Sequence, residues 1–418
     1  MTTRYGAFRL NFEQQQKRAK ELLKAARAGD AAASVRFRNS PPKLAEAQFL
    51  IARELRFESW ATLKWHIAAM TLEREAIGAL DSDLHTLHIR CGSDLQTPLQ
   101  EAGFRGDYYE HSYPYLIGPV REGVGCLEQR AHFIVDTYSD MFDAPLAYEG
   151  QLRELERSER VLHDCADYER VVIWSEGDCY DQLVLIRLLG HFAIHRRPPR
   201  LELINIGDFP GGKRFIGLGD LPPEALRMLW TTRKPAGSAQ LQVGLNAWRA
   251  LVNTDPRPLA ALMHSATPAL PLLAPALHRH LRELPSTLNG LSLTEQMALK
   301  LLAEQPHSLM KMIGRMVYVV DPLPGQGDWN TRRRVLDMEA ASAPVFTRSP
   351  RQNHDGNARP PWTDTLVITE LGRSVLRGEV DFRSLTPAAR WVGGVEIAAG
   401  NLDWRWDEQL RDAGLNRP

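Results

Sequence analysis

The amino-acid sequence predicts an α/β protein with a mostly parallel sheet in its N-terminal core and a largely helical C-terminal region. Short apolar runs at 87–91, 170–174 and 201–206 alternate with segments of helical periodicity, which is typical of parallel strands joined by crossover helices. From residue 222 onwards helical patterns dominate. We therefore expect a helical appendage at 1–80, an α/β domain at 81–221 and a helical domain at 222–418.

The composition of the chain argues against several classes of protein. The 418-residue chain carries 51 Lys and Arg against 51 Asp and Glu, and this balance argues against non-specific coating of nucleic acid. No apolar run reaches the ~18 residues that a membrane span needs. The first residues contain no apolar signal core, and the four cysteines form no C-x-x-C pair. We expect a cytoplasmic protein without a membrane segment.

The first 80 residues predict a small helical module. One apolar stripe runs through 12–30, and a second helical pattern begins after Pro41-Pro42. The segment Leu44 to Lys64 resembles the L-x-x-A-Q-x-x-x-A-R-E-x-G-F-x-S-W-x-x-L-K segment at the start of many bacterial ankyrin-repeat-like proteins, with Arg56 at the usual glycine. The resemblance implies a packing or docking module, so residues 1–80 are the expected surface for a protein partner. No repeat of ~33 residues follows.

The stretch from Thr86 to Val120 reads as a strand, a glycine turn, a helix and a less regular extended run. Gly92 can adopt backbone angles that other residues avoid, and Ser93 or Asp94 can cap the helix that follows. Such a turn can hold an anion against the helix N-terminus, although it matches neither G-x-G-x-x-G nor a P-loop. The alternative is a capped helix after a strand, with no ligand.

Three predicted strands deliver acidic residues just beyond their carboxyl ends. Asp94 follows the first strand, Glu176 and Asp178 follow the second, and Asp208 follows the third. Neighbouring parallel strands would bring these carboxylates to one sheet edge, where their oxygens suit Mg²⁺ or Mn²⁺. The candidate metal ligands are therefore Asp94, Asp178 and Asp208.

The same edge supplies candidate catalytic and binding residues. A metal held by carboxylates can assist hydrolysis, and nearby cations or amides can hold the substrate's phosphate or carboxylate. The catalytic candidates are Asp94, Glu176, Asp178 and Asp181; the ligand-binding candidates are Gly92, Ser93, Gln182, Lys213 and Arg214. The alternative is that strand-end acids only cap helices and form turns, which aspartate often does.

The histidines and cysteines show no metal-binding signature. His191 and His195 stand four residues apart, so one helical face can present both, but H-E-x-x-H is absent. The pairs His85/His88 and His278/His280 have spacings that separate their side chains, and we interpret all three pairs as surface or helix-end residues. Cys91 precedes the glycine turn, where a helix N-terminus would lower its thiol pKa, but the strand alternation favours burial.

The region 290–380 has the order of elements of a winged-helix-like unit. Ser292 and Glu295 predict a capping box, helices follow near 308–318 and 328–339, and strands near 345–346 and 365–368. Thr369 to Leu376 resembles the L-T-x-x-G-x-x-x-L closing helix of many winged-helix domains. The third helix of this winged-helix-like unit, near 328–339, carries Arg332, Arg333 and Arg334. These arginines are the candidate DNA contacts if the unit binds nucleic acid.

Several short motifs in fixed order resemble one bacterial family, named domain of unknown function 1835, with its C-terminal partner domain. They are Leu87–Asp94, Gly118-Pro119, Trp174 to Gln182, Phe215–Gly219, Leu291–Glu295 and Trp391–Asp407, and the resemblance spans residues 85 to 410. It implies an α/β front domain and a helical rear. It implies no particular activity and transfers no catalytic residues.

Two functional hypotheses follow. The first is a metal-assisted hydrolase or phosphoryl-transfer enzyme that acts on a small anionic or nucleotide-like substrate at the strand-end acids. The alternative is a non-catalytic regulatory or adaptor protein that binds a protein partner or DNA through the N-terminal helices and the winged-helix-like unit. Convergence of the acids in space favours the first, and a scattered set favours the second.

Overall fold

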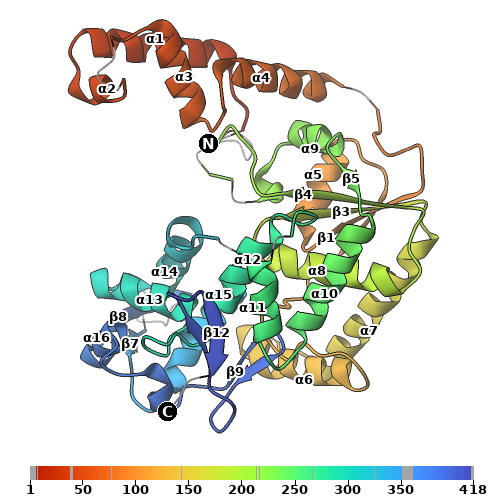
Figure 1. Ribbon diagram of the computed structural model, residues 1–418, viewed down its shortest axis with the longest axis vertical. Coiled ribbons are helices and arrows are strands. Elements are labelled where there is room, and N and C mark those ends of the chain that lie inside the picture. The colour runs from red at the N-terminus through yellow and green to blue at the C-terminus, as the bar shows by residue number, and fades with distance from the viewer. Residues whose placement is uncertain are drawn as a thin grey trace. The chain divides into compact units, whose positions relative to one another are not determined.

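The computed structural model describes residues 6, 8–37, 41–76, 78–142, 144–212, 214–215, 217–265, 267–323, 325–350 and 361–415 (Figure 1). The protein is a mixed α/β structure, 52% helical, with a mostly parallel five-stranded sheet and a helical remainder. The predicted α/β class is therefore confirmed. The chain forms two compact units: unit 1 comprises 1–110, 168–176 and 199–235, and unit 2 comprises 111–167, 177–198 and 236–418.

Unit 1 contains four N-terminal helices and the five-stranded sheet. Its elements are α1 (Phe12–Arg27), α2 (Ala31–Val35), α3 (Leu44–Glu54), α4 (Trp60–Glu75), β1 (Thr86–Arg90), α5 (Gln96–Glu101), β2 (Asp107–Glu110), β3 (Arg170–Glu176), β4 (Arg200–Ile206), α9 (Pro223–Trp230) and β5 (Lys234–Pro235).

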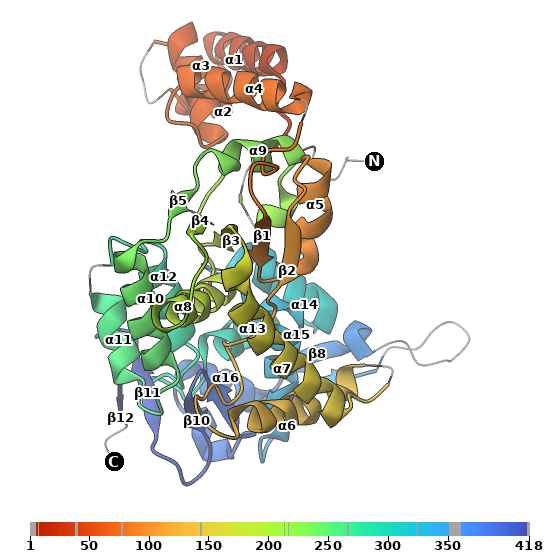
Figure 2. The same ribbon diagram turned by 90° about the vertical axis from the view of Figure 1, so that its right-hand side faces the viewer.

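The sheet has the strand order β2-β1-β3-β4-β5 (Figure 2). β1 pairs in parallel with β2 and β3, β3 pairs in parallel with β4, and the edge strand β5 is antiparallel to β4. The chain passes from β1 to β2 on one side and then to β3 on the other side of β1. The carboxyl ends of β1 and β3 therefore flank the point where strand order reverses, which is where open α/β sheets bind ligands.

Every residue of β1 and β3 is buried, including the polar ones. Trp174 Nε1 donates to His88 Nδ1 at 3.1 Å, and His88 Nε2 lies 2.9 Å from Asp81 Oδ2. Since Nδ1 accepts, Nε2 carries the proton and donates it to Asp81. The same carboxylate accepts the backbone N–H groups of Arg105 and Gly106 at 2.9 and 2.7 Å. Through Asp81, His88 of β1 is thus connected to the loop before β2.

The N-terminal helices pack through an apolar cluster on α1, α2 and α3. The residue that replaces the glycine of the ankyrin-like segment, Arg56, adopts a left-handed conformation with φ 68° between α3 and α4. Its backbone N–H donates to the carbonyl of Arg53 at 3.0 Å, so the turn that glycine favours forms without it. Arg56 also forms an ion pair with Asp208.

Unit 2 is mostly helical. Its elements are α6 (Cys126–Tyr138), α7 (Tyr148–Asp164), α8 (Cys179–Ile194), α10 (Ser238–Leu251), α11 (Arg257–His264), α12 (Leu273–Leu281), α13 (Leu293–Glu304), β6 (His307–Ser308), α14 (Leu309–Arg315), α15 (Gly327–Asp337), β7 (Phe346–Ser349), β8 (Thr365–Ile368), α16 (Glu370–Arg377), β9 (Arg390–Val392), β10 (Val395–Ile397), β11 (Trp404–Asp407) and β12 (Asp412–Leu415).

The central helix of unit 2 is α8, which is buried on almost every face. It packs closely on α10, because Gly244 of α10 lies against Leu189: a Cβ at Gly244 would stand 2.4 Å from the Leu189 Cβ. None of the described helices is long and apolar enough to cross a membrane.

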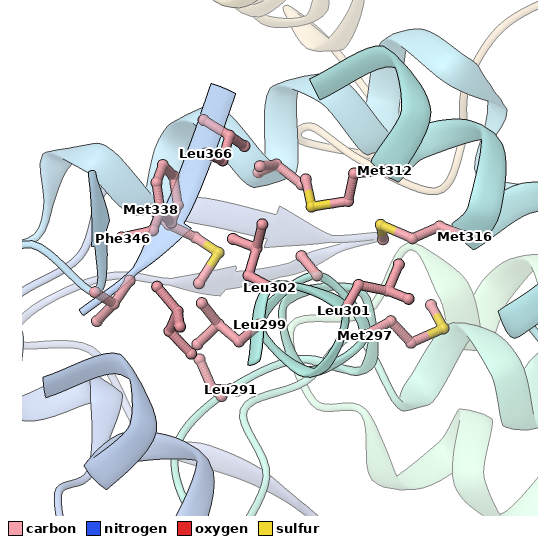
Figure 3. Close-up of a cluster of buried hydrophobic side chains, with 14 of the residues drawn as sticks. Leu291, Met297, Leu299, Leu301, Leu302, Met312, Met316, Met338, Phe346 and Leu366 are labelled. Atoms are coloured by element: carbon pink, nitrogen blue, oxygen red, sulfur yellow. The ribbon is translucent and has the colours of Figure 1, made fainter. Parts of the chain in front are cut away.

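The region from α13 to α16 has its own core and a three-stranded antiparallel sheet of order β6-β8-β7. Figure 3 shows side chains of this core pointing toward one another, among them Leu299, Leu302, Met338 and Leu366. The predicted capping box is confirmed: the Ser292 hydroxyl accepts the Glu295 N–H at 3.2 Å, and the Glu295 carboxylate accepts the Ser292 N–H at 2.7 Å. The tail forms two hairpins, β9–β10 and β11–β12.

Candidate functional site

The carboxyl ends of β1 and β3 bring two of the predicted acids together around one cation. Arg90, at the end of β1, donates from Nε and Nη2 to the Asp94 carboxylate, with both distances 3.2 Å, and also pairs with Glu176 at the end of β3. The backbone N–H of Leu218 donates to Glu176 at 2.7 Å. A buried guanidinium therefore already occupies the position between these carboxylates where the sequence predicts a metal.

The expected cap at the glycine turn is absent, so this part of the sequence analysis was wrong. A short 3₁₀ turn covers Ser93–Leu95, and no side chain caps it or α5. Asp94 binds Arg90 instead, because burial leaves that cation dependent on a nearby carboxylate. The Gly92 carbonyl accepts the hydroxyl proton of Tyr108. Cys91, expected to be buried, is partly exposed since β1 ends one residue before it.

The other predicted acids begin α8 in unit 2. Asp178 caps α8 by accepting the Asp181 N–H at 2.9 Å, which is the helix-capping role that the sequence analysis gave as the alternative. Gln182 follows on α8 and is fully buried.

The remaining candidates of the strand-end site have separate partners in unit 1. Asp208 is exposed and pairs with Arg56, whereas Asp94 pairs with Arg90. Arg214 is partly buried in the loop after β4, and Lys213 lies outside the described residues. The roles of Asp94, Asp178 and Asp208 as metal ligands stay predictions.

Two of the three arginines of α15 are engaged with carboxylates inside unit 2. Arg333 donates to Asp337 at 2.7 Å and to Asp140 at 3.0 Å, while Arg334 is buried 3.9 Å from Glu283. Arg332 is partly buried, and its Nε finds no hydrogen-bond partner among the described residues. Because Arg333 and Arg334 are committed to internal carboxylates, the arrangement does not favour the DNA interpretation.

A well-formed pocket lies within unit 2, away from the predicted residues. It is a cavity of about 540 Å³ lined by residues of segment 113–130, of α7 and of α8, and by Trp248 of α10. This volume is typical of small-molecule sites. Its lining combines aromatic rings with charged groups of both signs, namely Tyr113, Tyr115, Arg121, Arg130, Arg187, Glu122, Glu128 and Glu159.

Two arginines of the cavity are held by neutral backbone carbonyls. Arg130, 6% exposed, donates to the carbonyls of Ile117 and Pro114 at 2.5 and 2.8 Å. Arg121 donates to the carbonyls of Val252, at 3.2 Å, and Gly394. No carboxylate of the described residues forms an ion pair with either guanidinium. Burial lowers the pKa of both, yet arginine remains charged. Glu396 acts on Arg121 through its charge, whereas no carboxylate has such an effect on buried Arg130.

A third arginine and a short series of hydrogen bonds lie beside the cavity. Arg187 pairs with both oxygens of Glu159 at 2.6 and 2.7 Å. The Tyr115 hydroxyl lies 2.9 Å from His111 Nε2, and His111 Nδ1 lies 3.2 Å from the Ser158 hydroxyl.

His111 is a weak base in this setting. Complete burial, and then the charge of Arg187, lower the pKa of His111 to about 3, so the ring is neutral at pH 7. A serine nucleophile needs a base that accepts its proton, and a group of so low a pKa suits that role poorly. The arrangement is therefore suited to holding the cavity wall in place rather than to covalent catalysis.

Two histidines at the C-terminal end of α8 line the same cavity: His191 on the helix and His195 at its C-cap. The rings of His191 and His195 have centroids 4.6 Å apart and an interplanar angle of 34°. Burial and the charge of Arg187 lower the pKa of His191 to about 4. Its Nε2 is buried and finds no hydrogen-bond partner among the described residues.

The sequence analysis missed this cavity for a local reason. Its residues come from four separated stretches, and the stretch that supplies most of them, 113–130, has no strong periodicity before α6. The one usable signal was the four-residue spacing of His191 and His195 on a helix. The comparisons with known proteins add nothing: no family model, curated protein or solved structure matches the chain. The resemblances described above stay predictions.

Proposed function

We propose that the protein binds a small anionic ligand with a flat ring or apolar body in the cavity of unit 2. The observation that carries this proposal is the buried guanidinium of Arg130, which meets backbone carbonyls instead of carboxylates; partly exposed Arg121, in the same cavity, also donates to backbone carbonyls. A buried cation without a counter-charge is costly, and a ligand carboxylate or phosphate would supply that charge with bidentate hydrogen bonds.

The aromatic residues that line the cavity indicate what the uncharged part of the ligand looks like. Trp248, Tyr113 and Tyr115 line the cavity, and aromatic rings favour flat or apolar groups. Ser158 contacts His111, whose lowered pKa makes it a poor base, so the cavity offers no activated nucleophile at this pair. We therefore favour a non-catalytic, ligand-responsive function, which belongs to the regulatory class of the alternative hypothesis.

The proposal is tested by titrating the full chain with inorganic phosphate, adenosine monophosphate and benzoate in the presence of EDTA, using calorimetry. Arg130→Met and Arg121→Met should each weaken binding about 10-fold or more, since ~1.4 kcal/mol corresponds to one such factor. The matched control is Arg249→Met, which removes the same charge from the exposed face of α10 beside Trp248. Absence of binding by all three anions, or equal weakening by the control, would contradict the proposal.

A further inference from the structure

The C-terminal end of α8 presents two imidazoles to the cavity of unit 2. His191 lies on the helix and His195 is its C-cap residue, and their ring centroids are separated by 4.6 Å. His191 is 6% exposed, whereas His195 is exposed, so the pair runs from the cavity interior to its mouth. Two imidazoles this close together can bind one metal ion.

The ring of His191 has a nitrogen that a metal could use. Nε2 is buried and has no hydrogen-bond partner among the described residues. When the ring proton lies on Nδ1, the lone pair lies on Nε2 and can coordinate a metal ion.

A purely structural role for His191 does not explain why its Nε2 is buried without a hydrogen-bond partner among the described residues. A buried acceptor that is left unsatisfied costs ~1–3 kcal/mol, and a ligand at Nε2 would remove that cost. The positive charge of Arg187 on the same helix would repel a metal, but both Glu159 oxygens neutralise it at 2.6 and 2.7 Å. The imidazole is uncharged at pH 7 and needs no deprotonation before it coordinates.

We propose that His191 and His195 form a two-histidine site for a divalent transition metal such as Zn²⁺ at the mouth of the cavity. Imidazole nitrogen is a preferred ligand for such ions. No third His, Cys, Asp or Glu among the described residues completes a ready-made cluster with this pair. Water or a bound molecule would fill the remaining positions, so the site is exchangeable rather than a structural zinc centre. The proposal uses the same cavity as the anion but does not depend on the anion.

The test is a Zn²⁺ titration of chelator-treated full chain, free of EDTA and of added anions, followed by calorimetry and by histidine-selective ¹⁵N NMR. We expect one Zn²⁺ per chain and a Zn²⁺-dependent shift of the Nε2 resonance of His191, with Nδ1 still protonated. His195→Gln, at an exposed position, should weaken binding at least about 10-fold. His191→Gln should weaken it at least as much.

The control is His163→Gln, because His163 lines the same cavity from α7 and is exposed. Retention of the site in this variant supports the assignment to α8. Absence of stoichiometric binding, loss that follows His163→Gln, or loss that follows Asp178→Asn would overturn it. Anion binding is measured with EDTA present and metal binding without anion, so either proposal can fail while the other stands.

Discussion

Asp81 gives the sharpest stability prediction, because its carboxylate is buried and joins three parts of unit 1. Burial by itself raises the pKa of Asp81, but hydrogen bonds from His88 and from the backbone of Arg105 and Gly106 outweigh it and lower the pKa to about 2. The ordinary value is 3.8, so the shift is roughly two units, or about 2–3 kcal/mol in favour of the ionised folded state. Asp81→Asn should therefore lower the free energy of unfolding by about that amount at pH 7.

The lowered pKa of Asp81 in the folded protein determines how its contribution to stability depends on pH. The folded pKa is depressed, so this stabilisation is complete above pH 4 and is lost as the pH falls from about 4 towards 2. Urea unfolding followed by tryptophan fluorescence at pH 7 and pH 3 measures it, with Trp174 reporting next to the site. Asp107→Asn is the control, since Asp107 is exposed and should cost less than ~0.5 kcal/mol. The reasoning is refuted if both variants cost the same, or if the Asp81 effect is undiminished at pH 3.

Three further predictions concern unit 2. Gly372→Ala should destabilise by ~1–3 kcal/mol in urea unfolding because a Cβ there would meet a backbone oxygen at 2.1 Å, whereas Gly314→Ala, with nothing within 4 Å, should stabilise by ~0.5–1 kcal/mol; equal effects would contradict the packing argument. His111 and His280, whose pKa values burial lowers to about 3 and about 4, bind protons only when unfolded, so stability should fall as the pH drops from 6.5 to 4, and replacing either by a neutral residue should flatten that slope. Glu283→Gln should cost ~1–3 kcal/mol because it removes one of the two carboxylates that pair with buried Arg279 and leaves Asp321; no measurable cost by calorimetry would contradict this reasoning.

Periodicity predicted the backbone of this protein well. The alternation of apolar runs with helical segments gave the parallel order of β1, β3 and β4, because such strands need crossovers of helical length. The capping box at Ser292 and Glu295 was readable since both partners lie within four residues. Features decided by local hydrogen bonds or by a repeated pattern are thus accessible from the sequence.

The candidate site was less accessible, because partners of buried charges are set by tertiary contacts. The sequence placed Asp94 and Glu176 at neighbouring strand ends, and they do approach each other there. It could not show that Arg90, drawn inside by a strand buried on both faces, would stand between them. A buried cation takes the nearest carboxylates, so an acidic edge that looks like a metal site can be an ion-pair network instead.

The cavity of unit 2 poses the opposite problem, since its residues carry no joint pattern in the sequence. Arg130 and His191 each look like an ordinary helical residue, on α6 and α8 respectively. Their significance lies in which groups are not paired: a guanidinium that meets only carbonyls, and an imidazole nitrogen that meets no described partner. Unpaired buried charge and unpaired buried lone pairs are both unstable, so each points to something that binds there. We propose an anion at Arg130 and Arg121 and a metal ion at His191 and His195. A positively charged metal ion at the histidines would itself attract the anion.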